Sequence, residues 1–551
     1  MTASARAAAR PRALAGTGTL LRLALGRDRL RFAGWIAGVV LLAASSYLAY
    51  DTVFPDPATT AELTASFSSN TAFTLLLGEV HDLGTPGAFT TWRSLGLSSV
   101  AVSLMAIFTV VRHTRAEEDS GRAELVASAV VGRHAALTAA TLLAASACLA
   151  ATVAVTLSLL AASLPDGAPD LGGALALGAA IGATGLVFTG VAAVTAQLGS
   201  FSRTANALAG ALLAVTYVLR GWGAATSGAE WVVWLSPFGW GEQVLPYLEN
   251  RWVVLALPLA ATGVALVVAH LVLARRDLGF GLLGARPGPA TAAPRLASVW
   301  ALSWRLGRVS VAGWTAAFVL LGALYGSVTA SIGDIFRDNP ALEQILQETG
   351  SSGAAEDLTL VFLGSVPTIL ALVATVHGVQ RVLHGRTEEL EGRAEPLLAT
   401  STSRTAWLAS HGVAGLVSAT LVYAAGMVAF ALVTVATTDP GTVTVARLLV
   451  AGLVQVPAVW VVVGVAVVLL GAAPRFLPVA WVVVAVTFVL TIFGPALGLP
   501  DAALDLSPFT HVPEYLTEGL RAVPLVVLTV VAAALLATGF VGVRRRDLEQ
   551  H

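Results

Sequence analysis

Twelve apolar runs, each long enough to cross a membrane as a helix, decide what this chain can fold into. A span takes about 20 helical residues. Only 12% of the 551 residues are charged, against roughly 25% in soluble domains. The sequence predicts an all-α polytopic membrane protein and excludes a soluble enzyme. The predicted spans are 32–50, 94–111, 135–163, 171–197, 204–219, 252–274, 312–330, 358–376, 406–437, 448–471, 477–497 and 522–543.

The charges between these runs are sorted by side. With the N-terminus inside, the inner segments hold 26 Arg and 12 acidic residues, whereas the outer segments hold 6 Arg and 21 acidic residues. Inner loops of membrane proteins are enriched in basic residues. We therefore expect a multi-pass protein of the plasma membrane with both termini in the cytoplasm.

Polar residues recur along the chain at a fixed offset, which indicates a tandem duplication of a six-span unit. Because six is an even number, both copies enter the membrane from the same side, and we predict two parallel six-helix repeats with pseudo-twofold symmetry. The offset is 271 for His-x-Arg-x-Glu-Glu-x-x-Gly-Arg-Ala-Glu (113–124 and 384–395) and for Leu-Ser-Pro-Phe (235–238 and 506–509), 270 for Arg-Arg-Asp-Leu (275–278 and 545–548), and 279 for Ala-Gly-Trp (33–35 and 312–314).

An arginine-rich segment precedes the first span of each copy, at 20–31 and 296–308. Its mixture of Leu, Trp and Arg is typical of a helix that lies in the membrane interface, although a basic flank that obeys the charge rule reads the same way. The predicted organisation is a cytoplasmic N-terminus with an interfacial helix (1–31), a first six-span repeat (32–274), a cytoplasmic linker with a second interfacial helix (275–311), a second repeat (312–543) and a cytoplasmic tail (544–551).

The loop between the second and third spans of each copy carries dense charges of both signs. Helical pairs such as Glu118 with Arg122 contribute about 0.2–0.5 kcal/mol each, and a solvated loop shows such pairs too. Both copies nevertheless keep the pattern while the surrounding spans have drifted. We interpret the two loops as docking surfaces for a cytoplasmic partner, which Glu118 and Glu389 are predicted to face.

The outer segments between the fifth and sixth spans contain Ser236-Pro237 and Ser507-Pro508. Ser caps helices and Pro suits their first turn, so we expect a short re-entrant or interfacial helix in each copy. The tryptophans around the first of these segments also suit a simple aromatic belt at the membrane interface. The sequence favours neither interpretation: these segments could form a functional gate or only an aromatic belt at the membrane interface.

Other classes of function find little support. An ion-coupled transporter ordinarily carries an ionisable residue within its spans, and the predicted spans contain no Asp, Glu or Arg; His270, His377 and His411 lie near cytoplasmic ends. No zinc-protease or nucleophile-elbow motif marks an intramembrane enzyme. All 32 basic residues are Arg, so the lysine of a phosphate-binding loop is missing. Cys148 is the single cysteine, which excludes an intrachain disulfide.

Together these residues resemble the permease subunits of type-2 ABC exporters, which have six-span domains and a first cytoplasmic loop with a pattern like Glu-x-x-x-Gly-x-x-Glu-x-Leu. Glu117-x-x-x-Gly121-x-x-Glu124 fits this pattern, and so does the copy at 388–395. The fused twelve-span form is similar to actinobacterial permeases of the tetronasin-exporter type, which export polyketide antibiotics and other drugs. The second copy departs by placing Pro396 where the first has Leu125.

The resemblance implies that the loops at 115–133 and 386–404 are coupling helices, each seated on one of two copies of a cytoplasmic ABC ATPase that hold the ATP and Mg. This chain would then bind no cofactor or metal, have no catalytic residue, and move a hydrophobic small molecule across the lipid bilayer; we expect no nucleic-acid partner. The implied coupling residues are Arg115, Glu117, Glu118, Gly121, Arg122, Glu124, Arg386, Glu388, Glu389, Gly392, Arg393 and Glu395, and the implied substrate-path residues are Met105, Phe108, Tyr217, Leu372 and Phe488.

Overall fold

The chain divides into two compact units, unit 1 (Met1–Gly288) and unit 2 (Pro289–His551). Residues 547–551 of the predicted tail and 1–12 of the predicted N-terminal segment lie outside the described residues. The computed structural model describes residues 13–54, 60–61, 64–65, 67–68, 71–163, 170–277, 279–283, 290–291, 293–296, 298–337, 354–438, 443–492, 494 and 499–546.

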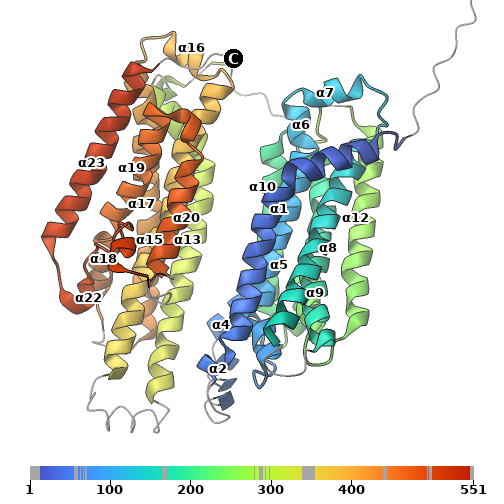
Figure 1. The fold of residues 1–551 in the computed structure, drawn as a ribbon, viewed down its shortest axis with the longest axis horizontal. Coiled ribbons are helices and arrows are strands. Elements are labelled where there is room, and N and C mark those ends of the chain that lie inside the picture. The colour runs from blue at the N-terminus through green and yellow to red at the C-terminus, as the bar shows by residue number, and fades with distance from the viewer. Residues whose placement is uncertain are drawn as a thin grey trace, which may run out of the picture. The chain divides into compact units, whose positions relative to one another are not determined.

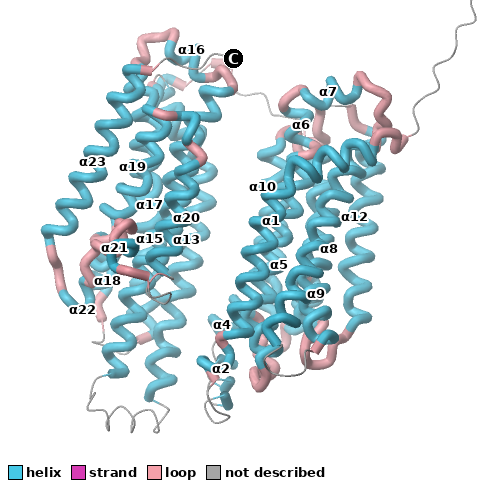
Figure 2. The backbone as a smooth tube through the Cα atoms, in the orientation of Figure 1, coloured by secondary structure: helices cyan, strands magenta, loops and turns pink. Residues whose placement is uncertain are grey.

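Unit 1 is a bundle of long helices with short helices at its two ends (Figures 1 and 2). The helices α5 and α9 form its centre, and α1, α8 and α12 pack around them. In chain order the elements are α1 (Thr17–Leu48), α2 (Tyr50–Val53), α4 (Thr71–Leu77), α5 (Pro86–Arg112), α6 (Arg115–Asp119), α7 (Arg122–Ala127), α8 (Ala135–Ser163), α9 (Leu171–Leu198), α10 (Ser202–Ala225), η2 (Glu230–Leu235), α11 (Pro237–Gln243), η3 (Trp252–Leu255) and α12 (Ala256–Arg275).

Unit 2 is also a helical bundle, with α15, α17 and α19 at its core and α13 and α23 packed against them. Its elements are η4 (Pro294–Leu296), α13 (Val299–Arg337), α15 (Ala354–Leu390), α16 (Ala394–Leu398), α17 (Arg404–Thr437), α18 (Val445–Leu453), α19 (Val456–Ala472), η5 (Pro474–Phe476), α20 (Val479–Ile492), α21 (Asp501–Leu504), α22 (Tyr515–Glu518) and α23 (Ala522–Arg545).

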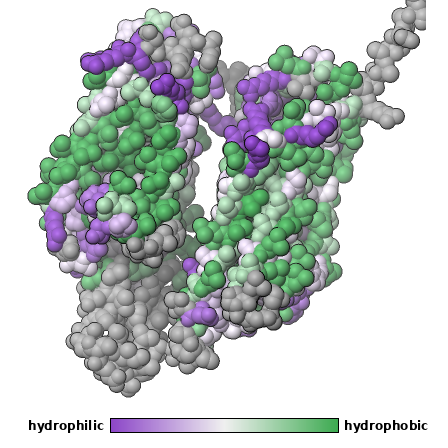
Figure 3. Space-filling view, viewed as in Figure 1, coloured by the Kyte–Doolittle hydropathy of each residue, from purple (hydrophilic) through white to green (hydrophobic). Residues whose placement is uncertain are grey.

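Among the described residues, eleven helices are long and apolar enough to cross a membrane. The eleventh predicted span, 477–497, contains α20, which is apolar but only 14 residues long, and residues 493 and 495–497 of that span lie outside the described residues. Figure 3 shows the apolar flank of each unit, with hydrophilic residues gathered at the end that carries α6 in unit 1 and α16 in unit 2. The helical content and the apolar flanks confirm a multi-pass membrane protein.

The arginine-rich segments do not form separate helices. Residues 20–31 belong to α1, which bends across the end of the bundle before it runs along it (Figure 1), and most of 296–308 belongs to α13. The backbone N–H groups of Gly132 and His134 donate to the carbonyls of Ala15 and Ala13 (2.9 and 3.0 Å), which fixes the start of this segment against the loop before α8.

The short helix predicted to begin at Ser-Pro is present in unit 1, and the same prediction is wrong in unit 2. The Ser236 hydroxyl caps α11, accepting from the Phe238 N–H, and Pro237 occupies the first turn. Ser507 makes the same bond to the Phe509 N–H (3.2 Å), but turns follow it instead of a helix. The Thr510 hydroxyl bonds the carbonyl of Ser507 (2.7 Å), and such local side-chain bonds compete with helix formation.

Candidate functional site

The charged loop of unit 1 follows α5 directly and consists of the short helices α6 and α7. Gly121 separates them with a φ of 72°, in the left-handed region that glycine tolerates best. Its N–H donates to the Glu118 carbonyl (3.0 Å), and in unit 2 Gly392 (φ 69°) donates in the same way to Glu389 (3.1 Å). The repeated glycine therefore ends one helical segment and turns the chain into the next in both units.

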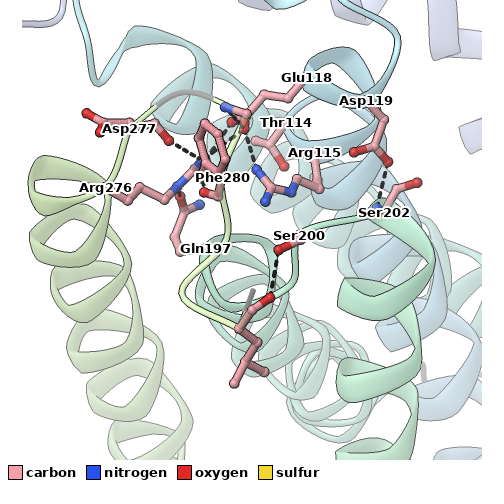
Figure 4. A network of polar contacts seen from close by, with 12 residues as sticks. Thr114, Arg115, Glu118, Asp119, Gln197, Ser200, Ser202, Arg276, Asp277 and Phe280 are labelled. Carbon is pink, nitrogen blue, oxygen red and sulfur yellow. Dashed lines mark hydrogen bonds and ion pairs between the residues drawn. The ribbon is translucent and has the colours of Figure 1, made fainter. Parts of the chain in front are cut away.

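Glu118 on α6 points back into unit 1 (Figure 4). Its two carboxylate oxygens accept from both terminal nitrogens of Arg276, at 2.5 and 2.9 Å, and the buried Arg115 forms a further ion pair with it. Such a two-pronged arginine–carboxylate pair is the strongest ion-pair geometry available to side chains. The Nε of Arg276 donates to the Gln197 side chain at the end of α9 (2.7 Å).

Further bonds close this corner of unit 1 (Figure 4). The Gly279 N–H also donates to Glu118 (3.3 Å), and Arg276 donates to the Phe280 carbonyl (3.0 Å), which folds the chain after α12 over the pair. On the next residue, the Asp119 carboxylate accepts from the Ser202 N–H (2.7 Å), the first residue of α10. Two neighbouring acids of α6 thus connect it to α9, α10 and α12.

The same corner of unit 2 repeats the arrangement with matching residues. Glu389 accepts from both terminal nitrogens of Arg546 (2.5 and 3.0 Å) and pairs with Arg386 (3.1 Å). Instead of a glutamine side chain, the carbonyls of Leu470 and Gly471 at the end of α19 accept from Arg546 (3.2 and 3.1 Å).

A third arginine completes each corner. Arg133 donates to the Arg276 carbonyl (2.5 Å), and Arg404 donates to the Arg546 carbonyl (2.7 Å), so each satisfies an acceptor at the end of the last long helix of its unit. We refer to these two sets as the arginine clamps: Arg115, Glu118, Arg133 and Arg276 in unit 1, and Arg386, Glu389, Arg404 and Arg546 in unit 2.

The clamps change the interpretation of the repeated loop. Glu118 and Glu389, predicted to face a partner, instead face arginines of their own unit, because the two-pronged pair requires them to turn inward. Glu117 pairs with Arg27 (3.3 Å), while Glu388 bonds His411 (3.1 Å). The side chains that remain outward are those of Arg122, Glu124, Arg393 and Glu395.

The predicted substrate-path residues lie in three different environments. Met105 and Leu372 are buried in the cores of units 1 and 2 respectively, each 2% exposed. Phe108 and Phe488 lie on the surfaces of their units, 47% and 39% exposed. Tyr217 is half-buried, and its hydroxyl donates to the Leu76 carbonyl (2.5 Å).

Beside Tyr217 lies an ion pair that the sequence analysis missed. The structure extends α10 to Ala225, so Arg220, fully buried, is within a spanning helix, and the expectation that these helices contain no arginine is wrong. Arg220 donates to Glu242 on α11 (2.8 Å) and to the Leu76 carbonyl (2.9 Å), and its guanidinium lies 4.3 Å from the centre of the Tyr217 ring. The Arg and Glu stand 22 residues apart, and only the helix–turn–helix path from α10 to α11 brings them together.

The last feature of this site concerns side chains that could hold a metal ion. Within the part of the chain that the structure describes, no group of three or more His, Cys, Asp or Glu side chains is placed to hold a metal ion. Cys148, the single cysteine, is buried in α8.

The apolar helices and the ion-paired loops define a multi-pass membrane protein. The family model described as "Multidrug efflux system permease Rv1217c, C-terminal domain" matches residues 18–275 and 296–544, which lie in units 1 and 2 respectively. The chain is also 41% identical over 549 residues to the multidrug efflux system permease protein Rv1217c of Mycobacterium tuberculosis (strain ATCC 25618 / H37Rv), covering 98% of this chain and 97% of that protein. This chain belongs to the Rv1217c family of efflux-system permeases.

Proposed function

We propose that this chain is the membrane-spanning permease of an ATP-driven ABC exporter that moves hydrophobic small molecules out of the cell. The name of its Mycobacterium tuberculosis relative, a multidrug efflux permease, supports export of drugs. The sequence offers no lysine for a phosphate-binding loop of its own, so an ATP-driven exporter built on this chain would take its energy from separate ATPase subunits.

The arginine clamps are the observation that carries this proposal. A loop that only connects two spans needs no buried ion pairs, whereas a loop that transmits force has to be attached firmly to the helices it moves. Each clamp attaches the charged loop to the ends of several long helices through charge-assisted bonds. A movement imposed on the loop therefore reaches those helices together.

The surface offered to each ATPase is the outward part of the loop. In unit 1 it includes Arg122, Glu124 and the exposed Leu125, and in unit 2 it includes Arg393 and Glu395. Apolar groups surrounded by charges suit a protein interface in which the charges set orientation and the apolar groups supply burial. Two such loops in one chain call for two ATPase subunits.

The proposed topology places both loops and both termini in the cytoplasm, in accordance with the excess of arginine in those segments. It also takes α20, 14 residues long, as the described part of a twelfth span, so that the two units are parallel repeats related by a pseudo-twofold axis. Reporter fusions at Arg122 and Arg393 are expected to read inside, and a fusion within 51–91 is expected to read outside.

The deciding experiment uses proteoliposomes with the purified permease, with and without its ATPase subunits. We expect drug uptake into inside-out vesicles only with ATPase and ATP, and a native mass that corresponds to one permease chain with two ATPase copies. Full transport by the permease alone under a proton gradient would overturn the proposal in favour of an ion-coupled transporter. Two permease chains in the minimal active complex would overturn the stoichiometry.

A further inference from the structure

A cavity of about 530 Å³ opens in unit 1 beneath the first turns of α1. Ligand pockets for small molecules generally measure about 300–1,000 Å³. Its walls come from α1, the charged loop, the start of α8 and the end of α12. Most of the wall is apolar, and Glu117 and the clamp residues Glu118 and Arg276 contribute polar groups.

The cavity exists because four alanines occupy the facing surfaces of α1 and α8. Alanine side chains end at Cβ, so the two helices leave space between them here. The repeat offsets of 279 and 271 identify the residues that stand at the same positions in unit 2. Ala24, Ala136, Ala139 and Ala140 correspond to Ser303, Trp407, Ser410 and His411.

In unit 2 these larger residues take up the corresponding space between α13 and α17. The Ser303 hydroxyl donates directly to the Ser410 carbonyl (2.8 Å). Trp407 is fully buried, and its ring lies 5.4 Å from that of His411 in an edge-on arrangement. Unit 2 thus has an aromatic pair, Trp407 and His411, at the positions where unit 1 has two alanines.

The polar partner of this aromatic pair is also duplicated. His411 Nε2 lies 3.1 Å from a carboxylate oxygen of Glu388, and because an ionised carboxylate only accepts, the imidazole donates. The corresponding acid in unit 1 is Glu117, which lines the cavity and whose side chain is 26% exposed. Its partner Arg27 is 50% exposed, and such half-exposed pairs contribute little and rearrange easily.

We propose that the cavity of unit 1 is a binding site for an aromatic, apolar small molecule that carries an N–H donor, with Glu117 accepting from that donor as Glu388 accepts from His411. The side chains of unit 2 show the shape and the hydrogen bond that fill such a space. Three acids, Glu117, Glu118 and Asp277, and three arginines, Arg27, Arg133 and Arg276, line the cavity, so its net charge is balanced and the apolar wall and the Glu117 acceptor define the ligand. This inference specifies a substrate class and rests on the proposed function for its role in export, although binding itself can be tested without transport.

The test uses ethidium, a planar aromatic cation with amino N–H donors, and the full-length permease in nanodiscs without ATPase. Fluorescence polarisation is expected to show one saturable site per chain. Ala140→His is expected to weaken binding about tenfold, and Ala136→Trp with Ala140→His is expected to abolish it, because these residues reproduce unit 2. Ala129→His, at an exposed position of the charged loop outside the cavity, is the matched control and is expected to bind like the parent.

Two further variants guard against a misfolded result. Trp407→Ala with His411→Ala is expected to create a second cavity and raise the stoichiometry from one ethidium to two. Glu117→Gln leaves the shape unchanged and is expected to weaken binding severalfold, since the amide accepts less strongly than a carboxylate. Each variant is compared with the parent for its elution profile and melting temperature.

The inference is overturned if the filled variants elute and melt like the parent and still bind ethidium at the parental affinity. It is also overturned if native mass spectrometry finds a lipid that occupies the site and is lost in the filled variants, with no saturable ethidium binding. Ethidium that binds as expected but is not exported when ATPase and ATP are present would count against the proposed function alone.

Discussion

The two units of this protein agree at one end and differ at the other. Both close the end with the charged loop by an arginine clamp, at matching positions and with closely similar distances. At the opposite end, unit 1 holds the buried pair of Arg220 with Glu242, whereas the repeat offset places Thr491 and Pro513 there in unit 2. Thr491 instead shares a hydrogen bond of 2.8 Å with Ser507.

This difference separates the features that the two units share from those in which they differ. Unit 1 has a longer segment between its first two long helices, and α4 from that segment supplies the Leu76 carbonyl that Arg220 bonds. A buried arginine needs several acceptors to offset the loss of its hydration. Where that segment differs in length and sequence, an arginine would lack these partners, and in unit 2 the Thr491 hydroxyl occupies the position with two hydrogen bonds, to the Thr487 carbonyl and the Ser507 hydroxyl.

The largest expected effect comes from breaking the clamps. Arg276→Ala leaves the Glu118 carboxylate without its main partner, and Arg546→Ala does the same to Glu389; removing one partner of a buried pair costs about 3–5 kcal/mol. Both variants are expected to lower the free energy of unfolding, measured by SDS titration, by similar amounts. The exposed neighbours Arg275→Ala and Arg545→Ala serve as controls and are expected to have little effect.

A clear inequality between the two clamp variants would break the comparison. If Arg546→Ala were tolerated while Arg276→Ala was not, then Gln197 and the folded-back chain of unit 1 would be the stabilising features instead of the shared ion pair. Equal tolerance of both variants would make the clamps dispensable for folding.

The opposite ends of the units provide the second prediction. Arg220→Met leaves Glu242 without its arginine partner and is expected to cost about 3 kcal/mol, whereas Thr491→Val removes the two hydrogen bonds of one hydroxyl and is expected to cost about 1–2 kcal/mol. Combining Arg220→Met with Glu242→Leu is expected to recover most of the loss, because replacing both members of a buried pair by apolar groups is often neutral. A double variant as unstable as the single one would show that Arg220 acts mainly through Tyr217 and Leu76.

The sequence predicted the helical membrane fold and a permease for drug efflux, because apolar run length and the order of the motifs are direct signals. It did not predict which way Glu118 points. A glutamate four residues before an arginine, such as Arg122, reads as an ordinary helical pair, and the true partner, Arg276, lies 158 residues away. The cavity was equally hidden, since Ala24 and Ala139 are unremarkable until their counterparts Ser303 and Ser410 are seen to bond.

The third prediction separates the inward acids of the loop from the outward ones. Glu124→Lys and Glu395→Lys alter exposed residues and are expected to leave the stability of the permease unchanged while weakening ATPase binding about tenfold, or about 1.4 kcal/mol. Binding is measured by titrating the ATPase onto immobilised permease at two salt concentrations. Glu118→Lys, which alters an inward acid, is expected to lower the stability of the permease itself. If Glu124→Lys and Glu395→Lys bind the ATPase normally, the outward loop is not the docking surface.

The smallest expected effect concerns pH at the end where the units differ. Burial raises the pKa of the Glu242 carboxyl above its ordinary value of 4.5, even though Arg220 and His81 act to lower it; Glu79 adds to the rise. An acid whose pKa is higher in the folded state than in the unfolded state favours folding most at low pH, and this contribution is lost as the pH rises above 4.5 through the folded pKa. Glu242→Gln removes the titration and keeps a similar shape.

The wild-type protein is therefore expected to lose stability relative to Glu242→Gln as the pH rises from 4.5 towards 8. The measurement is the difference between the two melting temperatures across this range. His81→Asn is the companion variant, because it removes a neighbour that acts to lower the pKa of the Glu242 carboxyl. A difference that changes in the opposite direction would mean that Arg220 outweighs burial and holds Glu242 ionised. The pair of Arg220 with Glu242 would then keep its charge throughout this pH range.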